Sequence, residues 1–258
     1  MLKEILRPIE NELQAVNKLV ERELYIKSAH IGKFAHLESS YNERVIRPAL
    51  VILSSRIYGL IEYKAVALAG VFQFIHMASR VHGSIPEKDS DYIREDLDPR
   101  DGSQFPVLVG DYLYGKFFSF LYHSGMINYL GPLADIICQI HEGGILKNKI
   151  TGKYTSTDAC REVVRKETAE LFAGCCAMGA RHAAASEKDQ GIMQRFGLNI
   201  GMAAGLMERG ADAKYVAAYL KDARSGLKGV PETPEKAVLE LIIKNLSEHN
   251  KDNRRMVI

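Results

Sequence analysis

An uncharged, apolar stretch between Lys64 and Arg80 constrains the fold more than any other part of the sequence. Its large apolar side chains recur at spacings of three and four residues, which predicts an α-helix buried on most of its circumference. The stretch is shorter than the ~18–20 apolar residues that cross a bilayer, so a core helix is the better interpretation. Polar residues that share one helical face follow at its end: His76, Arg80, Gly83 and Glu87. We therefore expect this helix to end beside a pocket.

Similar periodicity predicts helices along nearly the whole chain, and no segment indicates a convincing β-strand. The expected helices span residues 2–23, 31–37, 49–58, 107–123, 132–149, 158–178, 187–207, 214–227 and 234–249, besides the central one. We expect a boundary at Arg47-Pro48, because the residue before a proline resists the α conformation. Residues 86–105 are dense in charge, glycine and proline, which predicts a surface loop at the mouth of the pocket. The prediction is one all-α domain over residues 1–258, with roughly ten helices.

Charge and cysteine content limit the classes of function. Lysine plus arginine is 34 and aspartate plus glutamate is 32, a net charge of +2 that gives no support to nucleic-acid binding through bulk electrostatics. The four cysteines form no CxxC pair and no secretory signal precedes them, so we expect reduced thiols in a cytoplasmic protein. No transmembrane segment, zinc-ligand spacing or catalytic triad is legible.

Five stretches of this chain read as family motifs: IRPALVIL at 46–53, FIHMASRVH at 74–82, VGDYLYGK at 109–116, ETAELFAGCCAMGA at 167–180 and FGLNIGMA at 196–203. In this order they resemble motifs of the trans-prenyl diphosphate synthases, the family of farnesyl and longer-chain polyprenyl synthases. The resemblance implies a helical bundle around a deep central cavity. Members join an allylic diphosphate to isopentenyl diphosphate, with magnesium held by two aspartate-rich motifs on facing helices. Carboxylates suit this role because magnesium prefers hard oxygen ligands.

The first aspartate-rich motif departs from the family pattern. The family histidine matches His82, and the aspartate pair that follows it matches Gly83 and Ser84. The next ligand position falls on Glu87 under the shorter family spacing or on Asp89 under the longer one. Because affinity follows the number of carboxylates, the resemblance implies that magnesium binding here is weak or absent. The alternative role for these acids is a solvated surface loop.

The second aspartate-rich motif is altered as well. Its aspartates fall on Glu208, Arg209 and Asp212. Glu208 and Asp212 are four residues apart, so they are candidate metal ligands that could face the cavity together. Arg209 would instead put a cation where the family holds metal. The helices that normally follow this motif have no counterpart, so we expect a bundle that is shortened near the C-terminus.

Basic residues on the isopentenyl diphosphate side are retained in part. The family's lysine, arginine and histidine match Arg44, Arg47 and His76, and the first of a downstream arginine pair matches Arg94. The resemblance thus implies a diphosphate site, because guanidinium groups bind phosphate bidentately. The lysine of the family's middle motif is replaced by Glu167. Structural roles remain open, with Arg47 as a helix cap and His76 as a satisfied core histidine.

Three hypotheses about function follow. The favoured one is a degenerate prenyl synthase that serves as a non-catalytic or regulatory subunit, in a homodimer or in a heterodimer with an active chain. The second is an active prenyltransferase whose magnesium is held by Glu87 or Asp89 together with Glu208 and Asp212. The third is a protein that binds an isoprenoid diphosphate without turnover. Whether the chain is an enzyme by itself stays open.

Overall fold

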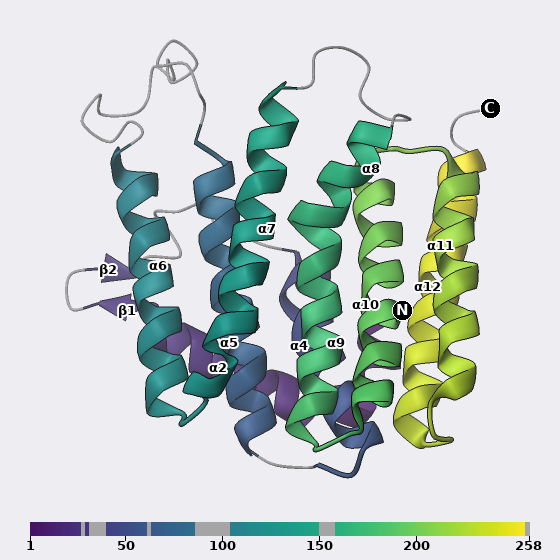
Figure 1. The fold of residues 1–258 in the computed structure, drawn as a ribbon, viewed down its shortest axis with the longest axis horizontal. Coiled ribbons are helices and arrows are strands. Elements are labelled where there is room, and N and C mark those ends of the chain that lie inside the picture. Colours follow the sequence, from purple (N-terminus) through teal and green to yellow (C-terminus); the bar gives the residue numbers. More distant parts are fainter. Residues whose placement is uncertain (27–28, 31–39, 61–62, 86–103, 150–157, 256–258) are drawn as a thin grey trace.

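The structure is a computed structural model that describes residues 1–26, 29–30, 40–60, 63–85, 104–149 and 158–255. Long helices that lie side by side make up nearly all of it (Figure 1). They are α1 (Leu2–Ile5), α2 (Glu10–Glu23), α4 (Tyr41–Ile57), α5 (Tyr63–Gly83), α6 (Gln104–His123), α7 (Leu130–Lys149), α8 (Asp158–Val164), α9 (Glu170–His182), α10 (Glu187–Glu208), α11 (Ala213–Gly226) and α12 (Pro234–Arg255). The predicted all-α class is confirmed.

Shorter elements connect the long helices. Among the described residues, 3₁₀ turns cover Arg7–Ile9 (η1), Ile127–Tyr129 (η4) and Leu227–Gly229 (η6), and a π-helical turn covers Arg165–Ala169 (η5). The strands β1 (Tyr25–Ile26) and β2 (Ala29–His30) form one small antiparallel pair, which the sequence did not indicate. The expected helix at 31–37 and most of the expected loop at 86–105 lie outside the described residues.

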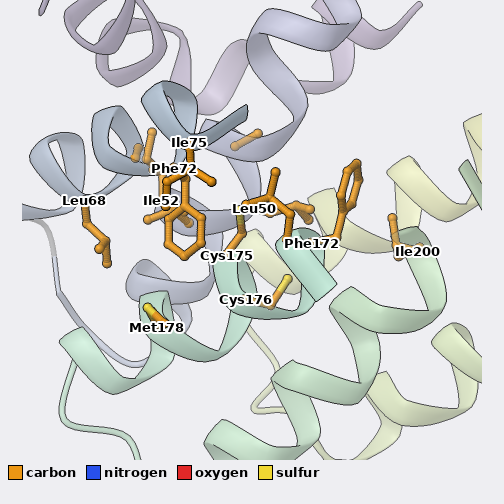
Figure 2. Close-up of a cluster of buried hydrophobic side chains, with 14 of the residues drawn as sticks. Leu50, Ile52, Leu68, Phe72, Ile75, Phe172, Cys175, Cys176, Met178 and Ile200 are labelled. Carbon is orange, nitrogen blue, oxygen red and sulfur yellow. The ribbon is translucent and has the colours of Figure 1, made fainter. Parts of the chain in front are cut away.

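The central helix α5 is buried as expected and extends the predicted stretch to Gly83. Its inner side chains meet those of α4, α9 and α10 in one continuous apolar core (Figure 2). Phe72 and Ile75 of α5 are fully buried there, as are Leu50 of α4 and Ile200 of α10. None of the described helices combines the length and apolarity that a membrane span requires. The four cysteines, all within the described residues, form no disulfides, and the cytoplasmic location stays a prediction.

The predicted boundary at Pro48 is wrong. Helix α4 begins at Tyr41, and Pro48 lies inside it. A capping box starts the helix earlier, because the Ser40 hydroxyl accepts from the backbone N–H of Glu43 at 3.3 Å and the Glu43 carboxylate accepts from the Ser40 N–H at 2.9 Å. Proline then removes only one helical hydrogen bond, which the capped and buried helix tolerates.

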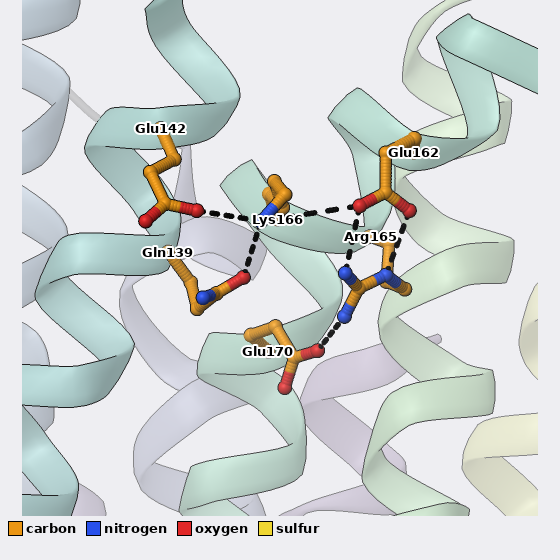
Figure 3. Close-up of polar contacts among 6 residues, drawn as sticks. All are labelled: Gln139, Glu142, Glu162, Arg165, Lys166 and Glu170. Carbon is orange, nitrogen blue, oxygen red and sulfur yellow. Dashed lines mark hydrogen bonds and ion pairs between the residues drawn. The ribbon is translucent and has the colours of Figure 1, made fainter. Parts of the chain in front are cut away.

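A π-helical turn divides the single helix expected over residues 158–178. This turn, η5, separates α8 from α9 and packs tightly against α7. A methyl group on Gly143 of α7 would lie 2.8 Å from Cγ of Glu167 and 2.9 Å from Cβ of Lys166, so only glycine allows this approach. Lys166 then donates to Gln139 at 2.6 Å and to Glu142 at 2.7 Å, which ties η5 to α7 (Figure 3).

Close packing of α10 depends on glycines spaced four residues apart: Gly197, Gly201 and Gly205. A methyl group on Gly197 would lie 2.4 Å from the carbonyl oxygen of Phe172, and one on Gly201 would lie 2.6 Å from Cα of Ala169. These contacts are with backbone, which cannot move aside as a flexible side chain can. The helices α9 and α10 therefore approach each other more closely than side chains would permit.

We expect Gly197→Ala to destabilise the protein by about 1–3 kcal/mol, the usual effect of overpacking a tight interface. The control is Gly191→Ala on the same helix, where the added methyl group would meet only Arg195, at 3.7 Å. That variant should be neutral or stabilising by up to ~1 kcal/mol, because alanine favours the helix. Urea unfolding followed by circular dichroism measures both. Equal stability of the two variants would contradict the packing described here.

Candidate functional site

A cavity of about 670 Å³ opens at the end of the bundle where α5, α7 and α10 terminate, the upper end in Figure 1. Its wall comes from α4, α5, α7, η5, α9 and α10. Apolar residues on one part of the wall include Ile140 and Leu171, whereas the polar part is dominated by arginine, glutamate and histidine. The cavity thus lies at the polar end of the central helix, where the sequence predicts a pocket.

Arg47 is the most deeply buried charged group in this wall, with 6% of the residue exposed. It projects from α4, donates from Nη1 to the carbonyl oxygen of Glu43 at 2.9 Å, and places its guanidinium 5.3 Å from the ring centre of Phe172. Its Nε–H has no hydrogen-bond partner among the described residues. Burial lowers the pKa of Arg47 to about 10, so the group stays charged at neutral pH.

His76 of α5 is the second buried polar group that lines the cavity. It is 9% exposed, and within the described part of the chain its Nε2 has no hydrogen-bond partner. Burial, reinforced by the charges of Arg47 and Arg80, lowers the pKa of His76 well below its ordinary value. The imidazole is therefore neutral at neutral pH.

Two further arginines lie at the cavity, and each forms an ion pair with a glutamate. Arg80 of α5 contacts the carboxylate of Glu43 on α4 at 2.5 Å. Burial alone would raise the pKa of Glu43, but hydrogen bonds from the Ser40 backbone and from Arg80 lower it below its ordinary value. Arg209, just after α10, pairs with Glu167 of η5. Both pairs join segments that are distant in the sequence.

Tyr114 of α6 contacts two residues that line the cavity. Its hydroxyl lies 3.0 Å from the Ser79 hydroxyl and 2.7 Å from Nε2 of His141 on α7. The ring of His82 lies 5.6 Å from that of Tyr114 and 5.9 Å from that of His141, between ring centres. Burial, and then His82, lower the pKa of His141. These contacts join α5, α6 and α7 beside the cavity.

Only some of the predicted site residues lie at the cavity. Arg47, His76 and Glu208 line the cavity, whereas Arg44 is exposed on α4 and is not part of the lining. Asp212 is not among the lining residues either, and its carboxylate instead caps α11. It accepts from the backbone N–H of Lys214 at 2.9 Å and pairs with the Lys214 ammonium at 3.2 Å. The remaining candidates lie outside the described residues: Glu87, Asp89 and Arg94.

Sequence reasoning missed several residues that shape the cavity. They are Glu43, Ser79, Tyr114 and His141, and it assigned no ligand-binding role to Arg80 or Arg209. Helical spacing puts Ser79 and Arg80 on the same face as His76 and Gly83, so the sequence could have identified these two residues of α5 as part of the cavity. Nothing in the local sequence indicates that Tyr114 or His141 meets this face, because both come from other helices.

The carboxylates at the cavity do not form a magnesium site in the described part of the chain. Glu43, Glu167 and Glu208 line the wall, but the first two are engaged by arginines. No group of three or more histidine, cysteine, aspartate or glutamate side chains among the described residues is placed to hold a metal ion. The described donor set therefore does not fit a cluster of hard divalent ions. Weak or absent magnesium binding by the whole chain stays a prediction.

Comparison with known proteins finds relatives named as synthases of isoprenoid chains. A family model described as Polyprenyl synthetase matches residues 37–206. Heptaprenyl diphosphate synthase component 2 of Geobacillus stearothermophilus is 31% identical over 201 residues, which cover 75% of this chain and 61% of that protein. Octaprenyl diphosphate synthase of Escherichia coli (strain K12) is 23% identical over 76% of this chain and 62% of its own length. The chain thus spans about three fifths of the length of these curated relatives.

Solved structures show the same fold. A decaprenyl diphosphate synthase from Rhodobacter capsulatus superposes with a TM-score of 0.80 at 19% identity, over 96% of this chain and 99% of that one. A deletion mutant of the heterotetrameric geranyl pyrophosphate synthase of mint gives a TM-score of 0.72 at 18% identity, over 92% and 99% of the two chains. Sequence identity this low supports a shared fold and does not extend to a shared activity.

We expect the Arg209–Glu167 pair to stabilise the protein measurably, because both side chains are only 19% exposed. A double-mutant cycle with Arg209→Gln and Glu167→Gln should give a coupling energy of about 0.5–3 kcal/mol in urea unfolding. The matched control is Arg161–Asp158, whose aspartate is 91% exposed and whose coupling should be at most ~0.5 kcal/mol. A coupling for Arg209–Glu167 no larger than the control would mean that the pair contributes nothing.

Proposed function

Because this chain belongs to the polyprenyl synthetase family, we propose that it acts in isoprenoid biosynthesis as a non-catalytic or regulatory subunit of a polyprenyl diphosphate synthase. Its partner would be an intact chain of the same family that carries the chemistry. The proposal has two parts, the loss of metal-dependent ionisation in this chain and the retention of a surface for a partner.

The observation that carries the first part is the Arg209–Glu167 ion pair at the cavity. Breaking a carbon–oxygen bond to diphosphate leaves a highly charged group, and divalent ions held by carboxylates stabilise that charge. Arg209 stands where the resembling family has an aspartate, and it occupies the carboxylate of Glu167. Together with the Arg80–Glu43 pair, it leaves Glu208 as the one unengaged carboxylate among the described lining residues. A lone carboxylate binds magnesium poorly.

The second part is supported by an apolar row on α6, the helix at the left edge of the bundle in Figure 1. Leu108, Phe118 and Tyr122 are 65%, 50% and 70% exposed, and their spacing puts them on one face of the helix. Helix α6 packs mainly against α5, which leaves its other side open within the described structure. Exposed large apolar groups that share a helix face are typical of protein interfaces.

Two of the similar proteins support partnering between unlike chains. The Geobacillus relative is named as component 2 of a heptaprenyl diphosphate synthase, and the mint neighbour is a heterotetrameric synthase. A component that lacks its own metal ligands can still contribute packing surface to such an assembly. The same α6 surface would serve a homodimer, so the identity of the partner has to be measured.

The purified chain alone should form no product from isopentenyl and allylic diphosphates with magnesium, because arginines engage two of the three described carboxylates at the cavity. Added to an intact polyprenyl synthase from its own source, it should change the rate or the product length. Radiolabelled isopentenyl diphosphate measures both. Product formed by this chain alone and lost in Glu208→Ala would establish the alternative, an active prenyltransferase, and would overturn the proposal.

Replacing the apolar row should weaken assembly. Leu108→Glu combined with Tyr122→Glu is expected to reduce affinity for the partner roughly tenfold to a hundredfold, because it buries charge in an apolar contact. Leu241→Glu on α12 is the matched control, since Leu241 is also exposed, at 45%, but lies on another helix. Analytical ultracentrifugation of the mixed chains gives the affinities. Complexes that form equally well with both variants would exclude α6 as the interface.

A further inference from the structure

We propose that His82 and His141 form a proton-sensitive junction between α5, α6 and α7. The junction is closed while the pair carries at most one charge, and a second proton loosens the start of α6 from the end of α5. Helix α6 carries the apolar row that we assign to partner binding, so the junction would make that surface respond to pH. Only this consequence rests on the proposed function, because the junction itself belongs to the chain alone.

The ring of His82 lies directly on the backbone of α6. A methyl group on Gly110 would lie 2.1 Å from Nε2 and 2.2 Å from Cδ2 of this ring, so the contact requires glycine. The same Nε2 lies 3.4 Å from the carbonyl oxygen of Val107 and 3.3 Å from the carboxylate of Asp111. A neutral ring can donate to the carbonyl oxygen, and a charged ring gains an ion pair with Asp111. His82 can therefore take up a proton and keep its place on α6.

His141 of α7 is held by hydroxyl groups and not by a carboxylate. Its Nε2 lies 2.7 Å from the Tyr114 hydroxyl, which lies 3.0 Å from the Ser79 hydroxyl. Cys138 is the other titratable side chain that acts on Tyr114. Within the described part of the chain, His141 forms no ion pair. Burial, and then the neighbouring His82, lower the pKa of His141.

A second proton on the pair would meet a like charge and no acid. The two ring centres are 5.9 Å apart, and two cations at that distance repel each other. The other charged side chains that line the cavity are four cations and three carboxylates: Arg47, Arg80, Lys147 and Arg209 against Glu43, Glu167 and Glu208. Two of these carboxylates already pair with arginines. The surrounding wall therefore does not compensate the second charge.

The direction of the pH effect follows from the lowered pKa of His141. As pH falls, the unfolded chain binds this proton before the folded chain does. The stability from this group is present above about pH 6.5 and is lost below it, by at most about a tenfold change in the unfolding equilibrium constant per pH unit. His76 is also buried and neutral and acts in the same direction. Urea unfolding should therefore show a smaller loss of stability on acidification in His141→Gln than in the natural chain.

NMR of the histidine ring signals tests the coupling within the pair, in the full chain between about pH 8 and pH 5. We expect the His141 signal to titrate at a higher pH in His82→Gln than in the natural chain, because the neighbouring charge is removed. His123→Gln is the matched control, since His123 is an exposed histidine at the other end of α6. It should leave the His141 titration unchanged. Equal titration of His141 in the natural chain and in His82→Gln would overturn the proposal.

Hydrogen exchange tests the opening of the junction. Between about pH 7.5 and pH 5.5, amides of residues 109–115 should lose protection roughly threefold to tenfold after correction for intrinsic exchange, while residues 117–123 keep theirs. In His141→Gln the loss should disappear, because glutamine can meet the Tyr114 hydroxyl and carries no charge. Loss of protection along the whole helix, or the same loss in His141→Gln, overturns the proposal. All of these measurements use the chain alone, so failure to find a partner would end the proposed function and leave this inference intact.

Discussion

Burial of α5 is the constraint on which the rest of the structure depends. From Ala67 to Ala78 its residues are buried on all sides, so no face of this part of the helix can be left to water. Neighbouring helices must therefore surround it, and α4, α6 and α9 do so with apolar faces of their own. The polar side chains from His76 onward lie in the last turns, and they cannot be enclosed without partners. The cavity at that end is the consequence of one helix that changes from apolar to polar along its length.

Apolar periodicity predicted the positions of the long helices well, and it did best where a typical cap residue stands directly before the helix. Ser186 and Thr233 are residues typical of N-caps, and both accept from backbone N–H groups, at 3.1 and 3.2 Å. The predicted helix boundary at Pro48 was wrong, because the capping box at Ser40 starts the helix several residues earlier and Pro48 lies inside it. Periodicity also failed at η5, since one extra residue in a turn leaves the apolar pattern on both sides readable as a single helix.

The site was predictable only in part. Resemblance to the family identified Arg47 and His76, and both line the cavity. Asp212 was expected to act with Glu208 through helical spacing, but that spacing applies only within a helix. Helix α10 ends at Glu208, and Gly210 then adopts a φ of +65°, so Asp212 begins the next helix as its cap. Glu167 and Arg209 are 42 residues apart in the sequence, so no local pattern could predict their contact.

These two replacements make most physical sense when taken together. The resembling family has a lysine where this chain has Glu167 and an aspartate where it has Arg209. A single replacement of either kind would put two like charges near each other at the edge of a half-buried cavity, at a cost in stability. With both replacements present the two charges are opposite, and in this chain they form an ion pair. The pair ties η5 to the end of α10. It is compatible with the proposed subunit role, which needs the fold and a partner surface and needs no divalent ions in this cavity.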